Sequence, residues 1–267
     1  MLPILLKIGP LTIHTYGFML ALGVACGLWF LYVQGKKQQM NAAKLLDLAF
    51  YTIIISLIGA KLVLFVGNFS TYMRNPGELF SLARSGGVFQ GGLAFGILFA
   101  LWYMRRHNIK IWKTADIMVP ALALGHGFGR IGCFSAGCCY GRACALPWGV
   151  RFQNEYAHEI TGITLNTTLH PVQLYEAALN FLNFAILFII LKKKKFDGQV
   201  FLFYIVNYSI IRYFTEFFRG DHADKTYILK SASPYLSISL PQMFALVGFV
   251  LGIILLAVMF KKKRSRA

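Results

Sequence analysis

Seven long apolar runs constrain this chain more than any other feature of its sequence. A helix needs about 20 mostly apolar residues to cross the hydrocarbon core of a bilayer. The chain has 267 residues, of which 57% are apolar and 14% charged, whereas soluble domains carry about 25% charged residues. The sequence therefore predicts an all-α, polytopic membrane protein with seven transmembrane helices, at about 12–34, 45–67, 87–104, 115–135, 173–191, 199–217 and 240–260.

The positive charges alternate between the two ends of these runs. Lysine and arginine together number 27, against 10 aspartate and glutamate residues. Basic clusters follow the first, third, fifth and seventh runs, at 36–44, 105–113, 192–195 and 261–266. Cytoplasmic loops carry such an excess, so we expect the N-terminus outside and the C-terminus in the cytoplasm. Nucleic acid is not an expected partner, because that function would place the charge on one soluble face.

The sequence predicts a single transmembrane domain, residues 1–267, without a linker or an internal repeat. The longest stretch between runs, about 136–172, lies on the outer side and is expected to form a small periplasmic head. The third run begins with the glycine-rich sequence SGGVFQGGLAFG. Two interpretations of this entry stay open. It is a broken or re-entrant segment beside a polar cavity, or it is a close helix contact through small residues.

Two arginines, Arg130 and Arg212, interrupt the fourth and sixth apolar runs. A guanidinium stays charged at any relevant pH, and placing one at the centre of a bilayer costs about 2.5–3.5 kcal/mol even on insertion scales. Such a residue usually faces a polar cavity or an anion, so the pair predicts a phosphate-binding site. The alternatives are that Arg130 extends to the interface, and that Arg212 only forms an ion pair with Glu216.

Polar residues of the sixth run repeat at helical spacing. Tyr208, Arg212 and Glu216 lie four residues apart, which keeps them on one face of a helix. We expect Glu216 to orient the guanidinium of Arg212 while that group binds a phosphate. Lys61 in the second run either extends outward or adds charge to the same site. Asp116, near the start of the fourth run, is expected to be structural.

The five cysteines lie in two places, one in the first run and four near the end of the fourth. Cys26 stands alone in the first run, where a packing role is expected, and the other four crowd the outer end of the fourth run. Their spacing is poor for zinc, and adjacent cysteines seldom bind one ion, so we expect a disulfide or plain thiols and no metal. A disulfide between the first two of the four would require the helix to end near 135–137. The four residues are Cys133, Cys138, Cys139 and Cys144.

At these residues the chain resembles the bacterial phosphatidylglycerol–prolipoprotein diacylglyceryl transferase family, over almost its whole length. The Gly-Arg-Ile-Gly and His-Pro-x-Gln-Leu-Tyr-Glu blocks together are highly specific, and the seven-span topology with an outer N-terminus is also the family's. The matching positions are Tyr16 and Gly17, Gly-Ala-Lys at 59–61, Gly-Gly-Leu at 91–93, Gly-Arg-Ile-Gly at 129–132 with Gly141, His-Pro-x-Gln-Leu-Tyr-Glu at 170–176, and Tyr-x3-Arg-x3-Glu-Phe at 208–217.

The resemblance implies an enzyme of the bacterial inner membrane whose active site faces the periplasmic leaflet. It implies transfer of the diacylglyceryl group of phosphatidylglycerol to the lipobox cysteine in a prelipoprotein signal peptide, with release of glycerol phosphate. The partners are therefore this lipid, the signal peptide and the membrane, and no cofactor is implied. The expected catalytic residues are Arg130, Arg212, Gln90 and Tyr16, and the expected substrate-binding residues are Arg130, Arg212, Tyr208, Glu216, Gly141, Lys61 and His170.

The chain departs from the family pattern where a base is expected. The family often has histidine before Gly-Gly-Leu, but this chain has Gln90, which does not titrate near neutral pH. Lys61 stands where the family usually has arginine, and Cys133 and Cys138 replace an asparagine and a glutamate. The base and the acceptor are therefore open. The rival functions are a lipid-modifying paralogue with another acceptor, an anion-binding transporter, and a thiol redox protein.

Overall fold

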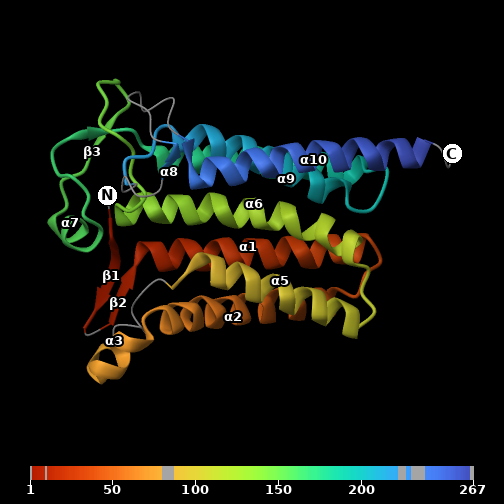
Figure 1. Ribbon diagram of the computed structural model, residues 1–267, viewed down its shortest axis with the longest axis horizontal. Coiled ribbons are helices and arrows are strands. Elements are labelled where there is room, and N and C mark those ends of the chain that lie inside the picture. Colours follow the sequence, from red (N-terminus) through yellow and green to blue (C-terminus); the bar gives the residue numbers. More distant parts are fainter. Residues whose placement is uncertain (1, 10, 80–86, 222–226, 230–237, 265–267) are drawn as a thin grey trace. The chain divides into compact units, whose positions relative to one another are not determined.

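The computed structural model describes residues 2–9, 11–79, 87–221, 227–229 and 238–264. Within these ranges, seven helices of 18 residues or more account for most of the chain (Figure 1). Each overlaps one of the seven predicted runs. They are α1 Thr15–Lys37, α2 Ala42–Gly67, α5 Phe89–Arg106, α6 Ile111–Ala136, α8 Val172–Lys193, α9 Gln199–Glu216 and α10 Leu240–Arg264.

Five of the described helices, α1, α2, α6, α8 and α10, are long and apolar enough to cross a membrane. The chain is therefore a polytopic membrane protein. Helices α5 and α9 coincide with the third and sixth predicted spans but are not among these five. Polar residues such as Asn207, Arg212 and Glu216 lower the hydropathy of α9. The count of seven spans and the orientation of the ends stay predictions.

Two helix boundaries differ from the predicted ones for the same reason. Helix α6 begins at Ile111 rather than at 115, and α10 continues through its lysines to Arg264 rather than ending at 260. Hydropathy falls where Lys113 and Lys261 enter the sequence, but the backbone hydrogen bonds of a helix continue through charged residues. An apolar run therefore marks the part of a helix that suits lipid, not the whole helix.

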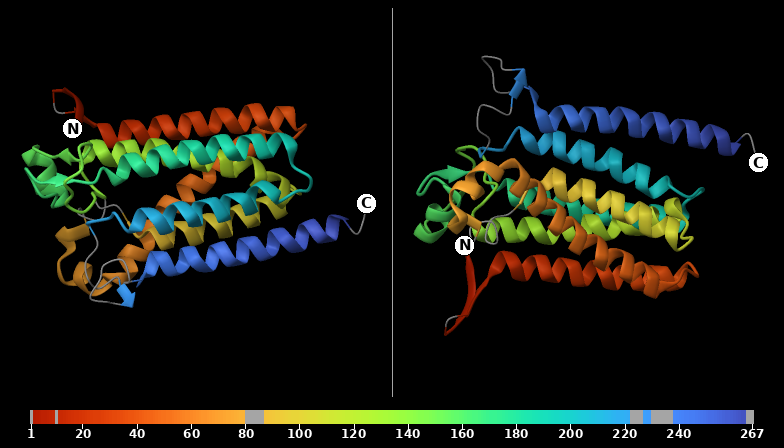
Figure 2. Two further views of the ribbon diagram at one scale, coloured as in Figure 1. Left: turned by 90° about the horizontal axis from the view of Figure 1, so that it is seen from above. Right: turned by 60° about the horizontal axis from the view of Figure 1, so that its bottom comes forward.

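The described chain divides into two compact units, and the first contains residues 1–30 and 115–267. In this unit α9 packs against both α8 and α10 (Figures 1 and 2). Helix α6 packs closely on the first turns of α1, because a Cβ atom added to Gly23 would lie 3.3 Å from the carbonyl oxygen of Gly125. The C-terminal ends of α6 and α9 and the N-terminal end of α8 lie together at one end of the unit (Figure 1).

The segment between α6 and α8 forms a small folded head at that end. Its elements are β3 Val150–Arg151, α7 Glu155–Thr161 and β4 Thr168–Leu169. Four fully or nearly fully buried residues make its core, and Phe134, Tyr140 and Val150 pack against them. The structure thus gives the stretch at 136–172 its own apolar core, and its periplasmic position stays a prediction. The four core residues are Phe152, Ala157, Ile163 and Leu169.

The second unit contains residues 31–114, with the short helices α3 Phe69–Arg74 and η1 Pro76–Glu78 beside α2 and α5. Its two long helices approach each other through glycines. A Cβ atom added to Gly91 would lie 2.9 Å from the carbonyl oxygen of Gly59, and one added to Gly92 would lie 3.0 Å from that of Ser56. Helix α5 runs unbroken from Phe89 to Arg106. Gly91 and Gly92 therefore make a close helix contact, and the helix that contains them has no break.

Three short antiparallel strand pairs complete the described structure, and the sequence analysis predicted none of them. Strand β1 (Ile4–Ile8) pairs with β2 (Leu11–His14), β3 pairs with β4 in the head, and β5 (Tyr227–Leu229) pairs with β6 (Ile238–Ser239). Strands of two to five residues give too short an alternation of apolar and polar residues to be recognised in a sequence.

Asp116 of α6 holds the start of α9. Its Oδ2 accepts hydrogen bonds from Lys194 Nζ at 2.9 Å and from the backbone N–H of Gly198 at 2.8 Å, and its Oδ1 accepts one from the N–H of Phe201 at 3.0 Å. Asp116 is fully buried. A buried carboxylate at a helix N-terminus satisfies backbone donors that have no partner inside the helix. The structural role expected of this residue is therefore its role here.

We expect Asp116→Ala to destabilise the protein by about 3–5 kcal/mol, because it removes the buried carboxylate that pairs with the Lys194 ammonium. Thermal unfolding in detergent measures the effect. Asp197→Ala is the matched control, because Asp197 binds the same ammonium at 2.8 Å but its side chain is 48% exposed. Exposed pairs contribute about 0–1 kcal/mol, so equal losses in the two variants would contradict the role of Asp116.

Candidate active site

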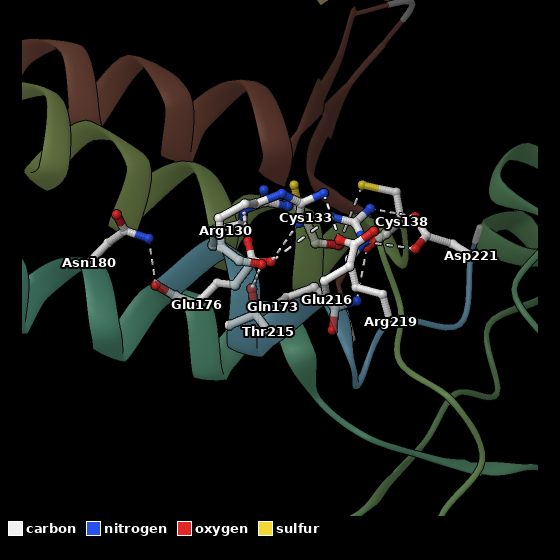
Figure 3. A network of polar contacts seen from close by, with 11 residues as sticks. Arg130, Cys133, Cys138, Gln173, Glu176, Asn180, Thr215, Glu216, Arg219 and Asp221 are labelled. Atoms are coloured by element: carbon white, nitrogen blue, oxygen red, sulfur yellow. Dashed lines mark hydrogen bonds and ion pairs between the residues drawn. The ribbon is translucent and has the colours of Figure 1, made fainter. Parts of the chain in front are cut away.

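One buried carboxylate, Glu176, lies where three arginines converge (Figure 3). Its Oε2 is 2.5 Å from Arg130 Nε, and its Oε1 is 3.6 Å from Arg212 Nη1 and 3.9 Å from Arg219 Nη1. The Glu176 side chain is 4% exposed, and the three guanidinium side chains are 9–23% exposed. Charges this well removed from water interact strongly, because little solvent screens them.

The helix ends explain this convergence. Arg130 lies in the last two turns of α6, Glu176 in the second turn of α8, and Arg212 in the last two turns of α9. Gly127 lets α6 and α8 come close, because a Cβ atom there would lie 2.6 Å from the ring of Phe181. Three charges that are distant in sequence therefore meet at one end of the first unit.

Two further carboxylates hold the arginines from the other side. Glu216 Oε2 lies 2.8 Å from Arg212 Nη2, and Glu216 Oε1 accepts a hydrogen bond from Ser239 Oγ at 2.9 Å. Asp221 binds Arg219 through two hydrogen bonds, of 3.0 and 2.7 Å. Burial opposes the charged form of Arg219, but Asp221 outweighs it and raises the pKa of Arg219 above its ordinary value. Paired oxygens of this kind fix the plane of a guanidinium.

Arg219 owes its place to a backbone contact between two loops. Gly141, after α6, forms an antiparallel bridge with Arg219, and the N–H of Gly220 donates to the carbonyl of Tyr140 at 3.0 Å. A Cβ atom on Gly220 would lie 2.5 Å from the Gly141 carbonyl oxygen, so only glycine fits. Arg142 Nε also donates to the Arg219 carbonyl at 2.9 Å. The loop after α6 thereby positions a charge that follows α9.

Several buried polar atoms at the site lack a hydrogen bond among the described residues. They include Gln173 Oε1 and the pair of Arg212 Nη1 and Glu176 Oε1, which lie 3.6 Å apart. The other end of the Gln173 amide donates to the carbonyl of Cys138 at 2.9 Å. A buried donor without an acceptor costs about 1–3 kcal/mol. An oxyanion placed beside Arg212 would satisfy that donor, so the site has the properties of an anion-binding site.

The structure thus brings together Arg130, Arg212 and Glu216 of the predicted residues. Glu216 contacts Arg212 as expected, and Glu176 contacts both arginines. Glu176 forms the link between them. The pair of Arg212 and Glu216 is therefore not self-contained, and Arg130 does not simply extend away from the protein to the interface.

Other predicted residues surround this centre. Tyr16 begins α1 and packs on Gly132, where a Cβ atom would lie 3.2 Å from its ring. The ring of Tyr208 packs against those of His126 and Tyr204, 5.5 and 5.7 Å away between centroids. Tyr208 therefore lies on the same helix as Arg212 but packs among aromatic rings. Gly141 forms the backbone bridge with Arg219.

His170 lies just before α8, beside the site rather than among its charges. Its ring packs on Phe218 at 5.2 Å, and its Nδ1 lies 3.4 Å from the Tyr175 hydroxyl. Burial lowers the pKa of His170 below its ordinary value. Neutral imidazole is therefore its main form at neutral pH, and it adds no charge there.

Gln90 and Lys61 belong to the second unit, which is described by itself. Gln90 lies in the first turn of α5 and is exposed within the described structure. Lys61 is half-buried in α2 and has an interaction partner. Their part in the site stays a prediction.

The sequence analysis assigned no role to three members of the charged cluster, which are Glu176, Arg219 and Asp221. A signal for Arg219 was present, because it follows Arg212 by seven residues and so continues the same helical face. Nothing local in the sequence indicated that Glu176 would meet three arginines from other segments.

Three of the four cysteines at the end of α6 lie close together. The Sγ atoms of Cys133, Cys138 and Cys139 lie within 4.8 Å of one another, and all five cysteines of the chain are free thiols. Helix α6 ends at Ala136, as a contact between Cys133 and Cys138 requires, with Gly137 at a φ of 80°. Cys138 and Cys139 both lie close to Cys133 although they are adjacent in sequence, and Cys139 has a left-handed φ of 59°.

The thiols of this cluster differ in acidity. Hydrogen bonds from Cys133 and Cys138, and the nearby guanidiniums of Arg219 and Arg130, lower the pKa of Cys139 well below its ordinary value. The hydrogen bond to Cys133 lowers the pKa of Cys138, but the contact with Cys139 and burial outweigh it and raise that pKa. Cys144 is separate: its backbone N–H donates to the carbonyl of Thr168 in the head at 2.9 Å.

The chain is similar to known proteins over almost its whole length. A family model described as "Prolipoprotein diacylglyceryl transferase" matches residues 3–258. A protein of Clostridium tetani named phosphatidylglycerol–prolipoprotein diacylglyceryl transferase is 34% identical over 239 residues, covering 89% of this chain and 93% of that protein. A second, from Clostridium perfringens, is 31% identical over 92% of this chain and 91% of its own length. A third, from Clostridioides difficile, is 31% identical over 94% and 92%.

Proposed function

Because the chain belongs to the prolipoprotein diacylglyceryl transferase family, we propose that it transfers the diacylglyceryl group of phosphatidylglycerol to the lipobox cysteine of a prolipoprotein. The reaction forms a thioether at the glycerol carbon that carried the phosphate oxygen, and glycerol phosphate leaves. It is a displacement at an sp3 carbon, so it requires a thiolate, an in-line approach and a stabilised leaving group.

The convergence of three arginines on Glu176 is the observation that supports this function best. A phosphodiester offers oxygens that match the planar donors of arginine. Arg212 Nη1 is buried without a hydrogen-bond partner among the described residues, so it is the donor best placed to receive a phosphate oxygen. Arg130 and Arg219 lie around the same carboxylate and supply further positive charge.

The carboxylates give these arginines a positioning function. Glu216 and Asp221 hold Arg212 and Arg219 before the lipid arrives. Fixed donors do not need to reorganise when negative charge develops on the departing phosphate, and this makes them effective in catalysis. Glu176 keeps the guanidiniums of Arg130 and Arg212 near each other despite their repulsion.

The proposed arrangement in the membrane follows the charge pattern of the loops. Seven helices cross the bacterial inner membrane, with the N-terminus outside and the C-terminus in the cytoplasm. The head and the arginine cluster then face the periplasmic leaflet. The prolipoprotein signal peptide brings its lipobox cysteine to this leaflet, where the lipid donor also lies.

Incubation of the purified protein with phosphatidylglycerol and a lipobox peptide tests the function. We expect a peptide mass increased by one diacylglyceryl group, together with released glycerol phosphate. A peptide with serine in place of the cysteine is the control and should stay unmodified, because its hydroxyl is a much weaker nucleophile than a thiolate. Binding of the lipid without any adduct would contradict transfer and favour an anion-binding protein.

Gln90 is expected to position a substrate group and not to remove a proton. An amide does not titrate, so Gln90→Ala should lower the transfer rate by about tenfold, the effect of one lost hydrogen bond. Gln90→His should be tolerated, because imidazole also forms hydrogen bonds. Initial rates of adduct formation measure both variants. Complete loss of activity in Gln90→Ala would contradict this limited role.

A further inference from the structure

Three thiols next to the arginine cluster have no part in the function proposed above. The Sγ atoms of Cys133, Cys138 and Cys139 lie within 4.8 Å of one another. Tetrahedral zinc with Zn–S bonds of about 2.3 Å places its sulfur atoms about 3.8 Å apart. Small side-chain rotations therefore suffice to bring all three onto one ion.

The backbone holds these three side chains on one point. Helix α6 ends with the N–H groups of Gly137 and Cys138 donating to the Cys133 carbonyl, at 2.9 and 3.2 Å. Gln173 of α8 donates to the Cys138 carbonyl at 2.9 Å. Cys139 adopts a left-handed φ of 59°, which side chains other than glycine rarely adopt. A strained residue held by the surrounding structure indicates a functional constraint.

The charges nearby suit a group of thiolates. Arg130 precedes Cys133 by three residues on α6, which places both on one face of the helix. Arg130 and Arg219 both interact electrostatically with Cys139. Three thiolates carry three negative charges and a divalent cation carries two positive ones, so the loaded site keeps one negative charge beside the two guanidiniums. Figure 3 shows Cys133 and Cys138 beside these arginines.

We propose that Cys133, Cys138 and Cys139 bind one zinc ion, whose open fourth position takes the thiol of the incoming lipobox cysteine. The inference rests on the proposed function, because it assigns the ion a task in that reaction. Three protein ligands with one open position are typical of catalytic zinc. A thiol that coordinates zinc is deprotonated outright. The ion then performs the deprotonation for which Gln90 is unsuited.

The atoms and electrons of the step balance. The substrate thiol loses its proton to solvent when its sulfur binds zinc. A lone pair of that sulfur forms the new C–S bond while the C–O bond breaks, and the bonding electrons leave with the phosphate oxygen. The arginines receive the added charge of glycerol phosphate. The thioether product is neutral and a weak ligand, so it leaves the ion and reopens the fourth position.

Metal analysis tests the site without reference to activity. The full-length protein, purified in detergent under reducing conditions, should contain one equivalent of zinc. Cys133→Ser, Cys138→Ser and Cys139→Ser should each lose most of it. Cys144→Ser is the matched control and should keep it, because Cys144 pairs with the head strand and lies outside the cluster. Wild-type protein that neither contains nor takes up zinc overturns the proposal, whether its thiols are free or oxidised.

Cobalt substitution tests the fourth position in the wild-type protein, so it does not depend on the folding of any variant. Cobalt bound by three thiolates should give a sulfur-to-metal charge-transfer band. A cysteine lipobox peptide should change this band, and the serine peptide should not. An unchanged band with the cysteine peptide overturns binding of the substrate thiol to the ion.

Activity separates this proposal from the function on which it rests. Removing zinc with a chelator should lower diacylglyceryl transfer by about 100-fold or more, the scale of lost acid–base assistance, and added zinc should restore it. An undiminished rate in metal-free protein overturns the zinc proposal and leaves the transferase intact. Zinc-loaded protein that forms no adduct contradicts the transferase function, while the metal content still reports on the site.

Discussion

Arg212→Lys should lower kcat/KM for diacylglyceryl transfer by about 100-fold or more, the loss expected when one fixed donor to a developing anion is removed. Arginine uses one nitrogen of its planar group, Nη2, to bind Glu216 at 2.8 Å, while Nη1 points at the shared centre. Lysine has one nitrogen and cannot occupy both positions. Its ammonium is expected to stay with Glu216, which leaves the phosphate without its buried donor.

The measurement is the initial rate of adduct formation over a range of phosphatidylglycerol concentrations. Arg151→Lys is the matched control, because Arg151 is exposed in the head. Its Nε donates a hydrogen bond of 2.8 Å to Thr168 Oγ1, far from the charged cluster in sequence. That variant should retain near-normal turnover. Near-normal turnover of Arg212→Lys itself would mean that charge alone suffices at this position.

Glu176→Gln is expected to destabilise the protein by about 3–5 kcal/mol, the usual effect of breaking a buried ion pair by removing one partner. The change is small in shape, but it takes away the charge that Arg130, Arg212 and Arg219 share. Glu216 and Asp221 still face Arg212 and Arg219. Arg130 keeps no carboxylate within an ion-pair distance among the described residues. Transfer activity should fall with stability.

Thermal unfolding in detergent, with and without phosphatidylglycerol, measures this effect. An anion that binds the folded state stabilises it by mass action, so the lipid should raise the midpoint of Glu176→Gln more than that of the wild type. Glu159→Gln, on the exposed face of α7, is the control, and its midpoints with and without the lipid should equal those of the wild type. A Glu176→Gln protein as stable as the wild type would show that the arginines do not depend on this carboxylate.

The helices and part of the site could be predicted because their signals are local. Each apolar run overlaps a helix, and the spacing of Arg212 and Glu216 alone predicted their contact. Glu176 could not be assigned in this way, because its partners lie on α6, on α9 and just beyond α9. A charge at the start of a helix looks the same in sequence whether it faces water or three guanidiniums.

The cysteine cluster illustrates a different limit. The spacing predicted an end of α6 near 135–137 only for a disulfide between Cys133 and Cys138; the helix does end at Ala136, but both thiols are free. The direction of the Cys139 side chain depends on one backbone angle. Left-handed conformations outside glycine are rare, so no sequence rule would have placed this thiol next to the other two. The short strand pairs could not be predicted either, because strands of two to five residues give too short a pattern.

The equal numbers of positive and negative groups around Glu176 have a consequence for product release. A phosphodiester carries one negative charge, but a phosphate monoester such as glycerol phosphate carries about 1.5 to 2 at pH 7. Three bare guanidiniums would therefore retain the product more tightly than the lipid that supplied it. Glu176, Glu216 and Asp221 stay beside these arginines and offset their charge, so the monoester is held less tightly. After it leaves, each arginine still has an internal counter-charge, and the enzyme is in its resting state without waiting for another anion.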